Sequence, residues 1–112
     1  MSVSHITTHI LDTGAGRPAA GVAVVLYQND GGTWRHVADS TTDTDGRAKD
    51  LGPEQLEAGH YKLNFATGDY YAGLQTATFF PEVDLVFDVT DAEHYHVPLL
   101  LSPFAYSTYR GS

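Results

Sequence analysis

The segment HYHVPLLL, residues 94–101, carries two interleaved kinds of side chain. Successive side chains of a strand point to opposite faces, so His94 and His96 fall on the same face. The opposite face is apolar or aromatic and consists of Tyr95, Val97 and Leu99. The alternation predicts a strand that buries one face in a core and leaves its histidine face outside that core.

Short β-rich runs separated by turn residues continue this pattern in both directions along the chain. Residues 4–12 alternate in the same way, with Ile6, Thr8 and Ile10 on the core face and His5, Thr7, His9 and Leu11 on the other. We expect further strands at 22–28, 34–42, 61–66, 85–89 and 104–110. A short helix is expected over 68–76, with Asp69 as its cap and Pro81 downstream. These seven β-rich runs and one short helix predict an all-β sandwich.

Length and composition narrow the possible partners. The 112 residues suit a single domain, 1–112, with a net charge of -8 that disfavours nucleic acid. Cysteine is absent, which excludes disulfides and thiolate chemistry and suits a reducing compartment. The N-terminus does not resemble a secretory signal, and no stretch approaches the ~20 apolar residues of a membrane span. We expect a cytoplasmic protein that does not enter a membrane.

The histidines are the main candidates for chemistry. His9, His94 and His96 could together form an open zinc site that activates water. However, His-x-His is a weak signal, and no carboxylate lies at a spacing typical of one that would hydrogen-bond to the histidine ligands. Asp43 and Asp45 resemble the start of a calcium loop only faintly, and we interpret them as a turn. No Gly-x-Ser-x-Gly elbow is present, so a serine nucleophile is not expected.

Other polar and aromatic residues are more simply explained by structure. His5, His36 and His60 are assigned to solvent or interface positions. Several aromatic residues are interpreted as packing residues rather than as a stacking platform, because no basic groove accompanies them: Tyr27, Trp34, Tyr61, Tyr70 and Tyr71.

Three segments resemble those of a known family. The run HYHVPLLLSPFAYSTYRGS, 94–112, closely resembles the closing signature of the 5-hydroxyisourate hydrolases, and its final YRGS is the most specific part. The run ITTHILDTGAGRPA, 6–19, resembles the N-terminal motif of the same family, and TDGR, 44–47, resembles a third segment. Transthyretin, a hormone carrier, shares the fold but replaces the histidines and the YRGS ending.

The resemblance implies a fold, an assembly and a site. The fold is a transthyretin-like sandwich of two four-stranded sheets, assembled as a homotetramer, a dimer of dimers with a central channel. The implied activity is hydrolysis of 5-hydroxyisourate in urate degradation, which we expect to need no metal or other cofactor. The resemblance leads us to expect an active site lined by His9, Arg47, His96 and the terminal Ser112, with Tyr109 in contact with the substrate. A transthyretin-type ligand carrier and a zinc-dependent hydrolase remain as alternatives.

Overall fold

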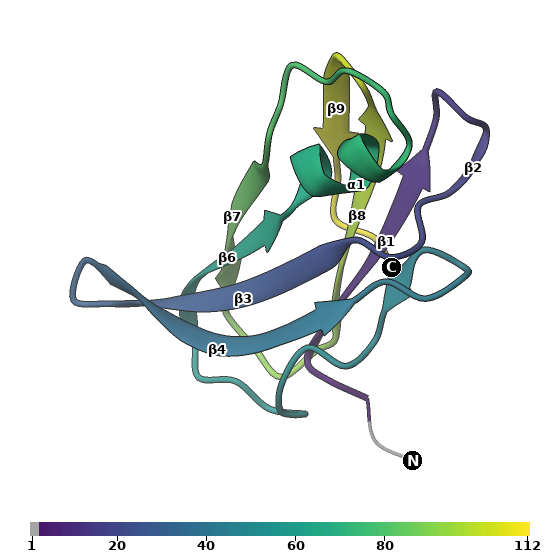
Figure 1. Ribbon diagram of the computed structural model, residues 1–112. Helices are drawn as coiled ribbons and strands as arrows, with labels where there is room; N and C mark the ends of the chain where they lie inside the picture. Colours follow the sequence, from purple (N-terminus) through teal and green to yellow (C-terminus); the bar gives the residue numbers. More distant parts are fainter. Residues whose placement is uncertain (1–2) are drawn as a thin grey trace.

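The computed structural model describes residues 3–112 as two β-sheets packed face to face (Figure 1). Nine strands and one helix follow one another along this part of the chain. The first sheet has the order β2-β1-β8-β9, with β5 also paired to β1, and contains β1 Ile6–Asp12, β2 Arg17–Pro18, β5 Arg47–Ala48, β8 Tyr95–Ser102 and β9 Ala105–Thr108. The second sheet has the order β4-β3-β6-β7 and contains β3 Ala23–Asp30, β4 Thr33–Thr41, β6 Gly59–Phe65 and β7 Val83–Val89. The helix α1, Thr67–Gly73, connects β6 to β7.

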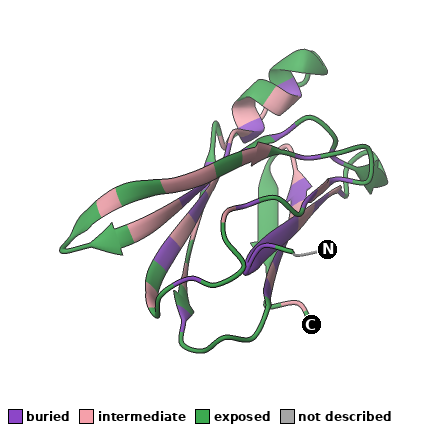
Figure 2. Ribbon diagram, turned by 90° about the horizontal axis from the view of Figure 1, so that it is seen from below, coloured by how far each residue is buried: buried purple, intermediate pink, exposed green. Residues whose placement is uncertain are grey.

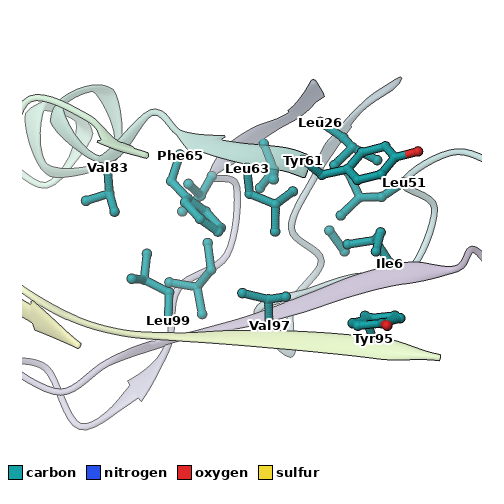
Figure 3. Packing of buried hydrophobic residues seen from close by; sticks show 14 of the residues in the cluster. Ile6, Leu26, Leu51, Tyr61, Leu63, Phe65, Val83, Tyr95, Val97 and Leu99 are labelled. Atoms are coloured by element: carbon teal, nitrogen blue, oxygen red, sulfur yellow. The ribbon is translucent and has the colours of Figure 1, made fainter. Parts of the chain in front are cut away.

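The core lies between the two sheets, where the inward faces of their strands meet. Figure 3 shows Leu63 and Phe65 of the second sheet opposite Val97 and Leu99 of the first. Leu63, Phe65 and Leu99 are completely buried. Burying apolar surface at roughly 25 cal/mol per Å² makes this contact the main stabilising element of the domain. The predicted inward face of residues 94–101 is therefore confirmed.

The position of the site depends on how β1 pairs with β8. The two strands are parallel, with Ile6 opposite Tyr95 and Thr7 opposite His96. Ile6 and Tyr95 point into the core, so Thr7 and His96 emerge together on the outer face of the sheet. The polar faces predicted for the first and last parts of the chain thus form one continuous surface.

The first sheet differs in detail from the predicted one. It contains five strands rather than four, because β2 and β5 are two-residue segments that both pair with the free edge of β1. The second sheet has the predicted four strands. The β3–β4 hairpin extends away from the body of the molecule, and its tip is exposed (Figure 2).

Two local predictions were wrong. The helix is present at the predicted place but begins at Thr67, and Asp69 lies within its first turn instead of capping it. His5 is not at a solvent or interface position: it precedes β1, is only 2% exposed and has both ring nitrogens bonded. The chain leaves the regular alternation before Ile6, so the strand pattern could not predict the direction of the His5 ring.

The remaining histidines and aromatic residues follow the predictions. His36 and His60 are exposed and pair with Asp39 and Asp88. Tyr61 and Tyr71 belong to the core, and Tyr70 packs against it. The Lys62 ammonium lies 4.8 Å from the centre of the Trp34 ring and 5.1 Å from the centre of the Tyr27 ring. Within residues 3–112 there is no helix with the length and apolarity needed to cross a bilayer.

Candidate active site

A tight turn places Arg47 beside β1. The carboxylate of Asp43 accepts hydrogen bonds from the backbone N–H groups of Asp45 and Arg47, at 2.9 and 3.0 Å. These bonds, the one from Arg47 first, lower the pKa of Asp43. Gly46 has a φ of 76°, and a side chain there would collide with the carbonyl oxygen of Ile10. The turn therefore seats β5 closely against β1 and brings Arg47 opposite His9.

A shared threonine links the two histidines of β8. The Thr7 hydroxyl lies 2.8 Å from Nδ1 of His96 and 3.0 Å from Nε2 of His94. The two imidazole rings stack with a centroid separation of 6.4 Å and an angle of 26°. Since Thr7 occupies Nδ1 of His96, Nε2 is the nitrogen left for a substrate or a water molecule.

The end of the chain closes over His96. The N–H of Gly111 donates to the carbonyl of His96 at 2.8 Å, and the guanidinium of Arg110 lies 4.2 Å from the centre of the Tyr95 ring. Figure 1 shows the last residues returning past β8 toward β1. A Cβ atom on Gly111 would lie 2.7 Å from Cδ2 of His96, so only glycine fits here without displacing the ring. Ser112 is thereby held next to the histidines.

These elements enclose a pocket of about 310 Å³ on the outer face of the first sheet. It is lined by Val3, Thr7, Thr8, Arg47, Lys49, His94, His96 and Ser112. The volume lies at the small end of the range for small-molecule sites, which is about 300–1,000 Å³. The pocket combines imidazole, guanidinium, ammonium and hydroxyl groups, so it suits a small, polar, electron-rich ligand.

The surroundings of His96 favour its neutral form. Burial lowers the pKa of His96, and the charge of Arg47 lowers it further, with smaller contributions from His94 and His9. Arg47 and Lys49 take part in none of the ion pairs found among residues 3–112. The pocket therefore offers a proton acceptor beside two cations that are available to a ligand, although the chain as a whole carries a charge of -8.

His9 lies next to this pocket but is not among the residues that line it. Its Nε2 is 2.8 Å from the carbonyl oxygen of Asp45. A carbonyl can only accept, so Nε2 of His9 carries the hydrogen and its Nδ1 is the acceptor. His9 is half-buried and close enough to contribute to the pKa shift of His96.

Comparison with known proteins identifies relatives that match nearly the whole chain. The family model described as HIUase/Transthyretin matches residues 6–111. The chain belongs to this family. A 5-hydroxyisourate hydrolase of Mesorhizobium japonicum is 47% identical, with 96% of this chain and 91% of the relative covered.

Solved structures of the HIUase/Transthyretin family share the fold. A 5-hydroxyisourate hydrolase of Klebsiella pneumoniae superposes with a TM-score of 0.86 and 35% identity, covering 99% of this chain and 100% of that one. Sea bream transthyretin in complex with thyroxine superposes with a TM-score of 0.89 and 34% identity, covering 95% and 93%. The transthyretin-like fold class is confirmed, and because both members superpose so well, the fold alone does not separate hydrolase from carrier.

The HIUase/Transthyretin fold brings together four of the five residues singled out in the sequence. Arg47, His96 and Ser112 line one pocket and His9 adjoins it. Tyr109 lies elsewhere in the single chain. It lines a hollow of about 540 Å³ between β7 and the β8–β9 pair, on the core-face side of β8 and hence across that strand from His96.

Sequence reasoning did not predict a role in the site for Lys49 or Thr7. Lys49 follows Arg47 by two positions, and the period of a strand would have placed both cations on one face. Thr7 was assigned to the correct face but to no role, because its contact with His96 depends on the pairing of β1 with β8. No local signal in the sequence predicts that pairing.

The three histidines of the zinc interpretation do not come together as a ligand set. His94 and His96 share Thr7, whereas Nε2 of His9 binds the carbonyl of Asp45. Among residues 3–112, no three His, Cys, Asp or Glu side chains converge in an arrangement suited to a metal ion. Asp43 and Asp45 form the turn that the sequence predicted.

Proposed function

We propose that this chain hydrolyses 5-hydroxyisourate, opening the six-membered ring at the N1–C6 amide bond to give 2-oxo-4-hydroxy-4-carboxy-5-ureidoimidazoline. The observation that carries the proposal is the pocket shared by His96, whose lowered pKa favours the neutral base, and Arg47, which forms no ion pair within residues 3–112. The hydrolases named among the relatives support the choice of substrate. The substrate is small, polar and rich in carbonyl oxygens, as the pocket requires.

The imidazoles of His96 and His9 activate the attacking water. Nε2 of His96 and Nδ1 of His9 are the acceptor nitrogens left by the contacts with Thr7 and with the carbonyl of Asp45. Neutral imidazole matches proton transfer near neutral pH, and such general base catalysis contributes about 10²–10⁴-fold. His96 faces the pocket, so it takes the proton of the attacking water, and His9 orients the water or substrate from the side of β1.

The cations stabilise the developing negative charge. Arg47 presents paired N–H donors that match the ureide oxygens and the oxyanion forming at C6, and Lys49 adds charge from the same side. Both approach from the β5 segment, whose position is fixed by the turn at Gly46. Ser112 closes the pocket from the chain end, where it orders substrate or water.

The experiment is a turnover assay. Loss of 5-hydroxyisourate absorbance, measured with freshly generated substrate and catalytic amounts of protein, should be much faster than the spontaneous decay. In the presence of the His96→Ala variant, the substrate absorbance should decay at nearly the spontaneous rate. A wild-type protein that does not exceed the spontaneous rate would contradict the proposal.

The carrier alternative is favoured by one observation, the similarity to a transthyretin solved with thyroxine. A hormone-sized ligand needs a wide and mostly apolar cavity, whereas this pocket holds about 310 Å³ and carries five ionisable or hydroxyl side chains beyond its threonines: Arg47, Lys49, His94, His96 and Ser112. A carrier would bind the substrate stoichiometrically without consuming it, so the same assay separates the two functions.

Metal independence is part of the proposal, since Arg47 supplies the electrophilic group. Turnover should survive prolonged treatment with a strong chelator. Activity lost to the chelator and restored by zinc would favour the zinc-dependent alternative and would require the three histidines to rearrange.

We propose a homotetramer, a dimer of dimers, as the working form. The outer strands β7 and β9 leave free edges, and apolar residues gather near the β8–β9 corner, where Phe79 and Phe104 are 71% and 68% exposed. In such an assembly the exposed Tyr109 of one subunit reaches the pocket of another and contacts the substrate. Mass measurement in solution tests the assembly. A cytoplasmic location stays a prediction that cell fractionation can test.

The role of Ser112 has its own test. A peptide tag added after Ser112 should reduce turnover strongly, while the same tag before Met1 should not. The tagged forms should keep the same mass in solution. Full activity in the form extended at Ser112 would remove this residue from the site.

A further inference from the structure

The hydroxyl of Thr7 occupies an unusual place between two imidazoles. It lies 2.8 Å from Nδ1 of His96 and 3.0 Å from Nε2 of His94, and Thr7 is only 6% exposed. His96 is half-buried within the pocket, and His94 is exposed at its edge. The three side chains thus form a chain of hydrogen bonds from the pocket to the solvent.

The Thr7 hydroxyl cannot donate a hydrogen bond to both histidines at once. It carries one hydrogen and donates to one ring, so it must accept a hydrogen from the other. Whichever ring receives the hydroxyl hydrogen, the hydrogen position on His96 is tied to the hydrogen position on His94. This constraint follows from the register that sets Thr7 opposite His96.

We propose that Thr7 is a positioning residue that couples His96 to His94 and provides the route by which the proton released in hydrolysis leaves the pocket. The inference rests on the proposed function, because it is the hydrolysis that produces the proton. Of the two hydrogens of the attacking water, one ends on the leaving nitrogen N1. The other becomes surplus when the new carboxylic acid ionises, so each turnover must export one proton.

The proton moves along the hydrogen bonds from His96 through Thr7 to His94. Before reaction, His96 bears its hydrogen on Nδ1 and donates it to Thr7, whose hydroxyl donates to Nε2 of His94. When Nε2 of His96 holds the surplus proton, the Nδ1 hydrogen of His96 passes to the Thr7 oxygen. The hydroxyl hydrogen passes to Nε2 of His94, and the hydrogen on Nδ1 of His94 leaves to solvent. One proton enters at His96 and one leaves at His94, and exchange with water then restores the starting tautomers.

The surroundings favour export toward His94. The charged or titratable groups that face His96 are Arg47 and Lys49 from the β5 segment, His9 from β1, His94 on its own strand, and Ser112 at the chain end. Burial and the charge of Arg47, in that order, lower the pKa of His96. A proton on His96 is therefore poorly held, and His94 is the exposed partner on the hydrogen-bonded path.

The first test compares Thr7→Val, which removes the hydroxyl and keeps the shape, with Thr7→Ser, which keeps the hydroxyl. Long-range ¹H–¹⁵N spectra of the substrate-free protein report which ring nitrogen of His96 bears the hydrogen. We expect Nδ1–H in the wild type and in Thr7→Ser, and a shift toward Nε2–H in Thr7→Val. The matched control is Thr67→Val, which removes a buried hydroxyl that is bonded to the Phe80 carbonyl and does not line the pocket, and it should leave the His96 signals unchanged.

The second test is kinetic. Thr7→Val should lower kcat about tenfold, with KM roughly unchanged and with Thr7→Ser restoring kcat, as expected when one hydrogen bond to a group that becomes charged is lost. His94→Gln should be slow in dilute buffer and recover when free imidazole is added as a proton carrier. His96→Gln should not recover, because it lacks the base itself.

Two results would overturn the inference. One is an unchanged His96 spectrum in Thr7→Val, and the other is an equal loss of kcat in Thr7→Val and Thr7→Ser, which would show that packing and not the hydroxyl matters. The spectra require no substrate, so they judge the coupling even if the wild type fails to hydrolyse 5-hydroxyisourate. That failure would count against the proposed function instead.

Discussion

His5 and His96 use the same side chain for opposite purposes. His5, just before β1, accepts a hydrogen bond from the N–H of Leu56 and donates one to the carbonyl of Glu93, at 2.9 and 2.8 Å. Its ring also packs edge-on against Tyr95, 5.5 Å away. His96, on the strand beside β1, has only Nδ1 engaged and faces a pocket. A histidine with both nitrogens bonded to the backbone stabilises the fold, whereas one with a nitrogen to spare can move a proton.

Substitution of His96 or Arg47 should have the largest effect. It should lower catalytic activity and leave the stability of the fold unchanged. His96→Ala and Arg47→Ala are each expected to lower kcat/KM by at least ~100-fold, as for lost base or oxyanion groups. Both side chains lie on the outer face, so the melting temperature should stay close to that of the wild type. His36→Ala is the control, because His36 is exposed and distant from the pocket. A collapse of thermal stability in His96→Ala would assign this residue the structural role of His5.

The converse substitution should affect stability and spare the chemistry. His5→Leu leaves the N–H of Leu56 and the carbonyl of Glu93 without their partner, which costs about 2 kcal/mol of unfolding free energy. Denaturant unfolding measures the loss. The activity of the folded fraction should stay near that of the wild type. His60→Leu, at an exposed position, is the matched control and should change stability by less than about 0.5 kcal/mol.

A smaller effect is expected from crowding His96 without removing it. In Gly111→Ala the new Cβ meets Cδ2 of His96, so the ring or the chain end must move by several tenths of an ångström. We expect a loss of about tenfold in kcat, because misplacement on that scale is costly at a catalytic group. Gly73→Ala is the control, since a Cβ there meets nothing within 4 Å. Equal activity of the two variants would mean that the contact with Gly111 does not hold the ring.

The smallest expected effect concerns the pH dependence of the activity. Because the pKa of His96 is lowered, first by burial and then by Arg47, His96 stays neutral to a lower pH than an ordinary histidine near ~6.5. Activity should therefore be constant above that pH and fall as the pH drops through the lowered pKa, where the imidazole becomes protonated. Arg47→Gln removes one cause of the shift, so NMR titration should place the His96 transition at a higher pH. A transition that does not move would show that the charge of Arg47 does not contribute to the lowered pKa.

Local patterns in the sequence were sufficient to predict many features of this protein. Alternation in 94–101 and 4–12 placed His9 and His96 outside the core, because a strand sends successive side chains to opposite faces. Turn chemistry identified the segment from Asp43 to Gly46, where a carboxylate and a glycine satisfy the needs of a tight turn locally. The YRGS ending and the two other segments identified the family, which the comparisons confirmed.

Only the tertiary structure decided which outer-face residues meet. The parallel pairing of β1 with β8 joins segments from opposite ends of the chain, and it sets Thr7 between His94 and His96. His5 was misassigned because the loop that covers it, around Leu56, also arrives from far along the chain. Local patterns fix the face on which a side chain lies, whereas its partners are fixed by register between distant strands. That register depends on the apolar surface that all the strands bury together in the core. The sequence of one segment is therefore not sufficient to predict it.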